Sequence, residues 1–156
     1  AATTGDLSGL EQSLANLRER YGSTAYAAQA VLLAARYYEQ GGQPEMARAS
    51  LQWMVDHGAD PGYKSIARLR LAGMLADGKQ YDEALKVLSA SFPAEFNALA
   101  ADRRGDLLML TGKAAEARAE FTKAWQALGA DSDYRRIVEV KLNALGVDPA
   151  ASGAKS

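Results

Sequence analysis

The chain has 156 residues, and its 48% apolar and 24% charged residues are typical of a globular protein. Eighteen basic and nineteen acidic residues leave a net charge of −1, which argues against a nucleic-acid site, because such sites need clustered lysines and arginines. The chain contains no cysteine, so disulfides, thiolate metal sites and a cysteine nucleophile are excluded. It also contains no run of about 18 apolar residues, so the sequence predicts no membrane span within these residues.

The first predicted helix covers about residues 9 to 21. Ser8 and Glu11 have the spacing of a capping box, with Ser8 as the N-cap. Apolar residues then recur at helical spacings of four and three, at Leu10, Leu14, Leu17 and Tyr21. Residues 1–7, which begin without methionine, are expected to be a disordered remnant or linker.

Three helical hairpins follow, and they repeat one set of positions. The three sets are Ala35, Tyr38, Gly42, Ala47 and Leu51; Ala72, Leu75, Lys79, Ala84 and Leu88; and Gly105, Leu108, Gly112, Ala117 and Phe121. The alanines of the second helices, Ala47, Ala84 and Ala117, therefore recur at similar intervals along the chain. A period of about 34 residues with a helix–turn–helix unit is typical of tetratricopeptide repeats.

Packing physics accounts for these residue types. Two antiparallel helices approach closely where side chains are small, so Ala35, Ala72 and Gly105 are expected to meet the alanines of the second helices. Glycine ends the first helices because a left-handed residue is needed there. The second hairpin departs from this pattern, because Lys79 occupies the glycine position and Gly78 precedes it, which predicts a turn shifted by one residue.

A last helix is predicted from about Tyr134 to Leu145. A residue of the segment 131–133 caps its start, and Gly146 and Pro149 end it. Residues 149–156 are expected to form a disordered tail. The predicted fold is therefore all-α, a right-handed α-solenoid of three tetratricopeptide-like hairpins with flanking N- and C-terminal helices, over residues 8–148.

The candidate binding residues lie on the first helices of the hairpins, which line the concave surface in this architecture. By spacing, the groove residues are Gln29, Leu32, Arg36, Glu39, Ile66, Leu69, Gly73, Ala76, Leu99, Asp102, Asp106 and Met109. Such a mixture of apolar and polar side chains suits a peptide groove. Alternatively, these residues pack on a terminal helix or face water.

A charged constellation overlaps this groove. It comprises Arg70, Asp102, Arg103, Arg104 and Asp106. One interpretation is an electrostatic clamp for a partner chain, and the other, which we favour, is ion pairing between hairpins that fixes how they stack. Acid–base catalysis by Asp102 and Asp106 is disfavoured because the flanking arginines keep both ionised.

No motif indicates an enzyme, a cofactor or a metal. His57 is the only histidine, and its place near a helix C-terminus favours a structural role. One histidine without cysteine argues against a transition-metal site, and phosphate-loop and nucleophile-elbow motifs are absent from the sequence. The large aromatics Trp53, Trp125, Tyr37 and Tyr63 are expected in the core, and any exposed one becomes an interface anchor.

Three stretches resemble the YfgM family of ancillary subunits of the bacterial Sec translocon. They are Leu69-Arg70-Leu71-Ala72, Ala101-Asp102-Arg103-Arg104-Gly105-Asp106 and Val140-Lys141-Leu142-Asn143-Ala144-Leu145. The resemblance covers about residues 8–148. It implies a non-enzymatic periplasmic domain carried on an N-terminal inner-membrane helix outside these residues, with translocon components, periplasmic chaperones or unfolded chains as partners. A scaffolding or homo-oligomerisation domain of a cell-envelope complex is the alternative function.

Overall fold

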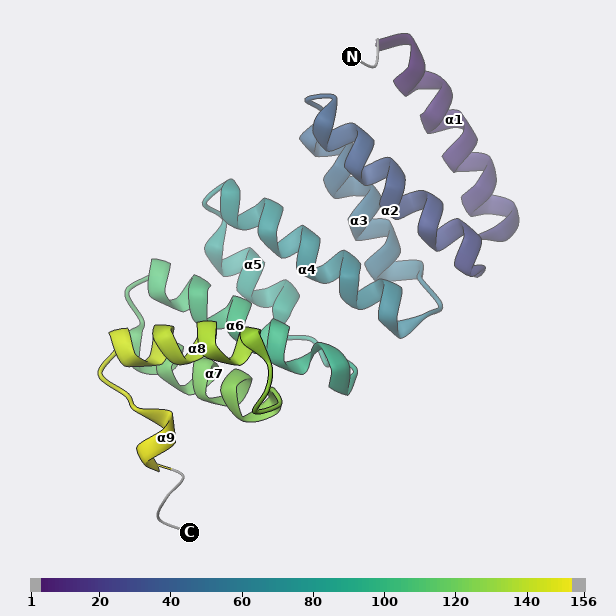
Figure 1. Ribbon diagram of the computed structural model, residues 1–156. Coiled ribbons are helices and arrows are strands. Elements are labelled where there is room, and N and C mark those ends of the chain that lie inside the picture. The colour runs from purple at the N-terminus through teal and green to yellow at the C-terminus, as the bar shows by residue number, and fades with distance from the viewer. Residues whose placement is uncertain (1–3, 153–156) are drawn as a thin grey trace. The chain divides into compact units, whose positions relative to one another are not determined.

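The computed structural model describes residues 4–152, and it is helical throughout (Figure 1). In that range it has nine helices and no strand. The helices are α1 (Thr4–Tyr21), α2 (Ala25–Gln40), α3 (Pro44–His57), α4 (Pro61–Asp77), α5 (Tyr81–Leu88), α6 (Ala94–Leu110), α7 (Ala114–Ala127), α8 (Asp133–Ala144) and α9 (Pro149–Ser152). The predicted all-α fold is confirmed, and the chain divides between Gly78 and Lys79 into two compact units.

In the first unit, α2 packs against α1 and α3, and α3 packs against α4. Thr24 caps α2 by accepting a hydrogen bond from the amide of Ala27, and Asp60 caps α4 in the same way. The small residues Ala35 and Ala47 are both fully buried in the α2–α3 hairpin. Their neighbours complete a dense apolar core.

In the second unit, α6 packs on α7, and α8 packs on α7. The core is formed by Ala101, Leu108, Ala117, Phe121, Ala124, Val138 and Leu142. Gly105 lies against the ring of Phe121, whereas the sequence analysis placed it against alanines. A Cβ atom on Gly105 would lie 2.6 Å from Cδ1 and 2.8 Å from Cζ of that ring, so only glycine fits there.

The turns of the three predicted hairpins keep one register. Gly42 and Gly112 adopt left-handed conformations, with φ of 72° and 75°, and Lys79 adopts the same conformation at 59°. The predicted one-residue shift at Lys79 is therefore wrong. The turn dictates a left-handed residue at this position, and lysine adopts that conformation at an energetic cost that glycine avoids.

The helix ends differ from the sequence analysis at both termini. Helix α1 begins at Thr4, so Ser8 lies within it and does not mark its start. A capping motif permits a helix to begin without forcing it, and no proline interrupts the preceding residues. Helix α9 occupies Pro149–Ser152 within the predicted tail. The expectations for residues 1–3 and 153–156 concern segments outside the described residues.

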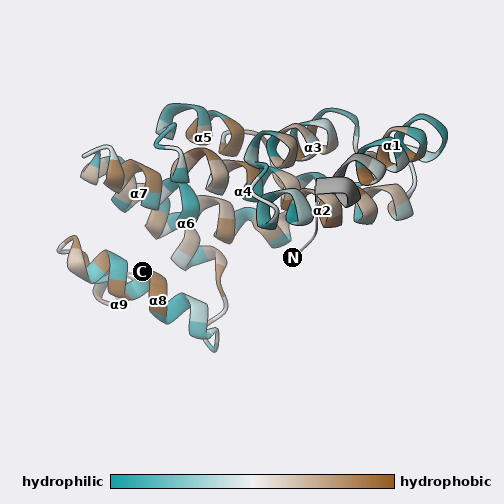
Figure 2. Cartoon of the chain, turned by 90° about the horizontal axis from the view of Figure 1, so that it is seen from above, coloured by the Kyte–Doolittle hydropathy of each residue, from teal (hydrophilic) through white to brown (hydrophobic). Residues whose placement is uncertain are grey.

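Most helices carry hydrophobic and hydrophilic stretches side by side (Figure 2). This pattern is expected of helices that bury one face and expose the other. None of the helices described is both long and apolar enough to cross a membrane.

Candidate functional site

The predicted groove residues of the first unit lie on two neighbouring helices, α2 and α4. Gln29, Arg36 and Glu39 are exposed on α2, and Leu32 is half-buried. On α4, Ile66 and Gly73 are exposed, whereas Leu69, Arg70 and Ala76 are half-buried. The sequence therefore identified residues that form one accessible surface on these two helices.

Hydrogen bonds tie α4 to α2 along this surface. The Gln29 amide donates to the Tyr63 hydroxyl at 2.8 Å. The Arg70 guanidinium donates to the backbone carbonyl of Leu32 at 2.9 Å, and it lies 3.7 Å from the Glu39 carboxylate. These contacts fix the spacing of the two helices while most of the outward side chains stay in contact with water.

A hollow of about 650 Å³ opens on this surface. It is lined by Arg36, Glu39, Gln40 and Arg70. Within the described part of the chain, the Arg36 guanidinium has no hydrogen-bond or ion-pair partner, whereas Arg70 is held by Leu32 and Glu39. The hollow therefore presents one solvated cationic group that no intramolecular contact neutralises.

Exposed apolar side chains extend the same face of α2. Tyr26, Leu33 and Tyr37 are 77%, 53% and 49% exposed. Leu33 and Tyr37 line a second hollow of about 180 Å³, which also includes Arg36 and Gln40. The expectation that Tyr37 lies in the core is therefore wrong, and the sequence analysis missed Tyr26 and Leu33. Their spacing of seven and four residues places them on one side of α2 as an apolar stripe. Because the buried face of α2 is apolar as well, the sequence pattern alone does not distinguish this exposed stripe from the core face.

Two of the predicted groove residues of the second unit, Asp102 and Asp106, are in a different environment, because side chains of α8 contact them. Asp102 is only 2% exposed. The Lys141 ammonium is 2.7 Å from a carboxylate oxygen of Asp102 and 2.8 Å from one of Asp106, and the Tyr134 hydroxyl donates to Asp102. A terminal helix thus occupies the face of α6 that the sequence analysis assigned to either a partner or the chain's own end.

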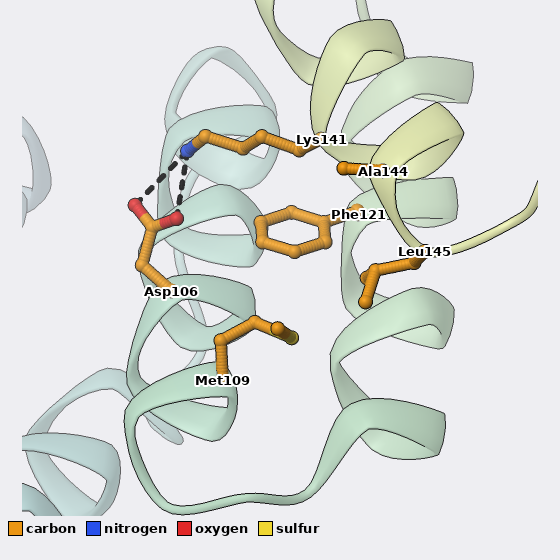
Figure 3. Close-up of a pocket in the computed structure, with 6 residues that line it drawn as sticks. All are labelled: Asp106, Met109, Phe121, Lys141, Ala144 and Leu145. Carbon is orange, nitrogen blue, oxygen red and sulfur yellow. Dashed lines mark hydrogen bonds and ion pairs between the residues drawn. The ribbon is translucent and has the colours of Figure 1, made fainter.

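Beside this network lies a hollow of about 210 Å³, in which Met109 faces Phe121 and Leu145 below the Lys141–Asp106 ion pair (Figure 3). Met109 is 41% exposed at its edge, and Leu99 is half-buried elsewhere on α6. Burial, the hydrogen bond to Asp102 and the negative charge of Asp102 raise the pKa of Tyr134. The Tyr134 hydroxyl thus serves as a donor to the Asp102 carboxylate.

The charged constellation is held by contacts within the chain. Arg104 donates to Glu120 at 2.7 Å and to the carbonyl of Leu88 at 2.9 Å, and Arg103 lies 4.0 Å from Asp106. Burial raises the pKa of Glu120, but hydrogen bonds from Lys123 and Arg104 outweigh it and leave that pKa lowered. The favoured interpretation, ion pairing between hairpins, fits the contact of Arg70 with Glu39, whereas Arg104 pairs with Glu120 within one hairpin and Arg103 with Asp106 within one helix.

His57 lies at the C-terminal end of α3. Its ring stacks on Trp53 with centroids 5.2 Å apart, and its Nδ1 atom is 3.1 Å from the Trp53 carbonyl. The ring of Trp125 lies 3.8 Å from the Arg135 guanidinium. These contacts are structural. Among the described residues, no group of three or more His, Cys, Asp or Glu side chains is placed to hold a metal ion.

Sequential helical hairpins with a repeated small–large–glycine pattern define a helical-repeat protein of the tetratricopeptide type. The family model for the tetratricopeptide repeat-like domain matches residues 1–147, and the chain belongs to this family.

Two curated relatives carry the description "Ancillary SecYEG translocon subunit". The protein of Neisseria gonorrhoeae is 29% identical over 136 residues, which cover 87% of this chain and 65% of the relative. The protein of Escherichia coli K12 is 32% identical over 126 residues, or 78% of this chain and 59% of the relative. The chain is thus a distant homologue of these subunits over most of its length, and it spans less than two thirds of either. The family resemblance seen in the sequence is confirmed.

Proposed function

We propose that this chain is the protein-binding domain of an ancillary subunit of the SecYEG translocon, and that it works without catalysis. The full-length protein is then anchored in the inner membrane by a helix outside these residues, with this domain in the periplasm. Its partners are translocon components, periplasmic chaperones or unfolded chains. The observation that carries the proposal is the open surface on α2 and α4, which joins exposed apolar side chains to an unpaired arginine.

This surface has the composition of a binding site. Tyr37 and Leu33 offer apolar area, and aromatic and arginine side chains dominate the energetics of protein interfaces. The corresponding face of α6 is covered by α8, so Asp102 is closed to a partner in this structure. Of the residues predicted from the sequence, Gln29, Arg36, Glu39 and Ile66 are thus the accessible part of the proposed site.

Site-specific photocrosslinking in cells tests the proposal. A photoreactive amino acid is placed at Leu33 or Tyr37 of the full-length protein, and captured proteins are identified by mass spectrometry. The matched control is Gln52, an exposed residue on α3. We expect translocon subunits or periplasmic folding factors from Leu33 and Tyr37 and not from Gln52. If the three positions yield the same captured proteins, or none, the proposal is wrong.

A separate observation favours self-association as the second candidate function. On α8, Ile137 and Val140 are 54% and 67% exposed, and Ala144 lies on the same helix face. Sedimentation equilibrium tests this function, with Val140→Lys as the disrupting variant. A wild-type chain that stays monomeric over the whole accessible concentration range excludes the homo-oligomer.

A further inference from the structure

The α2–α4 pair of the first unit and the α6–α8 pair of the second unit carry corresponding residues at several positions. The repeated hairpin positions align α2 with α6, because Ala35 on α2 corresponds to Gly105 on α6. The residue that follows each of them is charged, and it is Arg36 on α2 and Asp106 on α6. Arg36 and Asp106 therefore occupy equivalent positions in the two units.

Helix α4 of the first pair and helix α8 of the second pair correspond as well. Tyr63 on α4 corresponds to Tyr134 on α8, and the hydroxyls of both tyrosines bond to the preceding first helix. The cationic side chain seven residues further along, Arg70 or Lys141, also reaches back to that helix. A tyrosine hydroxyl and a cation thus link the helices of each pair, although their partners differ: they are Gln29 and the Leu32 carbonyl in the first unit, and Asp102 and Asp106 in the second.

The two pairs differ in charge at several positions of the first helix, and one of these is the position of Arg36 on α2 and Asp106 on α6. In the second unit, the cation Lys141 meets the anion Asp106 at 2.8 Å. In the first unit, the residue that corresponds to Asp106 is Arg36, and it lines the same hollow as Arg70. Two cations therefore stand where the second unit has a cation and an anion. Glu39, at 3.7 Å from Arg70, offsets only one of them.

The surroundings of Arg36 indicate which chemical groups lie beside an anion that binds between Arg36 and Arg70. Arg36 and Gln40 line both the larger hollow and the smaller one, which Leu33 and Tyr37 also line. An anion between the two guanidinium groups therefore has apolar side chains immediately beside it. A carboxylate suits this place because a guanidinium can donate two parallel hydrogen bonds to it.

We propose that the α2–α4 surface binds a polypeptide segment in which an aspartate or glutamate stands next to aliphatic or aromatic residues. The carboxylate lies between Arg36 and Arg70 and takes the place that Asp106 has in the second unit. The neighbouring apolar side chain lies on Leu33 and Tyr37. This proposal rests on the proposed function, because it gives the partner of that surface a chemistry.

Fluorescence anisotropy with defined peptides tests the proposal on the whole chain. The probe is a short amidated, fluorescein-labelled peptide of alternating glutamate and leucine, and its matched partner has glutamine in place of every glutamate. We expect the glutamate peptide to bind about fivefold more tightly, since an exposed ion pair contributes up to about 1 kcal/mol. Arg36→Gln removes this preference. Arg20→Gln, an equal change of charge at an exposed position of α1, preserves it.

Two further variants separate charge from apolar contact. Arg36→Asp reproduces the pairing of the second unit, so it is expected to pair with Arg70 and abolish the preference for glutamate. Leu33→Ser is expected to lower the affinity for both peptides by the same factor, because it removes apolar contact only. Circular dichroism checks that the variants, which change exposed side chains, retain the helical fold.

Several results would overturn the proposal. They are equal affinity for the two peptides, no binding of the glutamate peptide, or an effect of Arg20→Gln as large as that of Arg36→Gln. A preference for a glutamine peptide with a free C-terminal carboxylate, or for anionic phosphatidylglycerol vesicles over peptide, would also overturn it. If photocrosslinks from Leu33 to translocon subunits persist unchanged in Arg36→Gln, the proposed function stands and this inference fails. If no crosslink forms, the proposed function fails, whatever the peptides do.

Discussion

Removing the ammonium group of Lys141 is expected to destabilise the second unit strongly. Lys141→Met retains an apolar stem of similar length, but among the described residues it leaves Asp102, 2% exposed, with only the Tyr134 hydroxyl as a partner. Breaking a buried ion pair from one side costs about 3–5 kcal/mol, because an uncompensated charge stays out of water. Since Tyr134 still donates to the carboxylate, we expect the lower end of this range, about 3 kcal/mol.

The repeat provides a matched control at Arg70, which corresponds to Lys141. The Arg70 side chain is 30% exposed and its ion-pair partner Glu39 is 49% exposed, so Arg70→Met leaves no buried charge behind. An exposed ion pair contributes about 0.2–1 kcal/mol, and we expect a loss of at most about 1 kcal/mol. Urea denaturation followed by circular dichroism measures both losses, and hydrogen exchange with mass spectrometry locates the lost protection in α8 for Lys141→Met.

A second comparison separates pairing from packing. In the double variant with Asp102→Asn, no buried charge remains, so the loss should be smaller than in Lys141→Met alone. Equal losses for Lys141→Met and Arg70→Met, or a double variant less stable than Lys141→Met, would refute the reasoning that burial of Asp102 sets the cost.

Three other substitutions test individual features. Gly105→Ala is expected to lower the free energy of unfolding by about 1–3 kcal/mol, because its Cβ would overlap the Phe121 ring. Its control, Gly73→Ala, places the Cβ in open space within a helix and should raise stability by about 0.5–1 kcal/mol, as urea denaturation will show. Lys79→Gly relieves the left-handed conformation at φ 59° and should stabilise the chain by up to about 1 kcal/mol in the same assay, whereas a loss would contradict the strain. The lowered pKa of Glu120 stabilises the fold above the unfolded-state pKa of 4.5, and this stabilisation is lost as pH falls through the lower folded-state value. Glu120→Gln should therefore flatten the dependence of the urea midpoint on pH below about pH 5, and an unchanged acid dependence would contradict this.

The sequence predicted the hairpins well because their determinants are local. Gly42 and Gly112 form the turns of their hairpins, and the small residues Ala47 and Ala117 follow each turn by five residues. This short spacing recurs along the sequence and reveals the repeat. The turn at Lys79 was predicted wrongly because a residue type only favours certain backbone angles. The closed turn itself dictates the angle that the residue at this position adopts. A context of packed helices overrides the preference of one residue.

The candidate site was harder to predict because exposure is a tertiary property. Asp102 and Arg36 both stand on the outward side of a first helix, and the sequence placed both in a groove. Whether such a residue is exposed depends on the side chains of the neighbouring helix. Asp102 is contacted by Lys141 and Tyr134 of α8, whereas Arg36 shares a hollow with Arg70 of α4. The spacing placed both residues on first helices, but it did not predict that α8 covers Asp102 while Arg36 stays exposed.

Burial separates the charges that hold this protein together from those available to a partner. Asp102 is desolvated by folding, so the free energy of its contacts with Lys141 is already part of the stability of the chain. Arg36 is exposed and has no hydrogen-bond or ion-pair partner among the described residues, so its charge can contribute to binding. Replacing Arg36 should accordingly change affinity while leaving the urea midpoint unchanged, whereas replacing Asp102 should shift the midpoint. Charged residues on the first helices can therefore serve stability in one unit and recognition in the other.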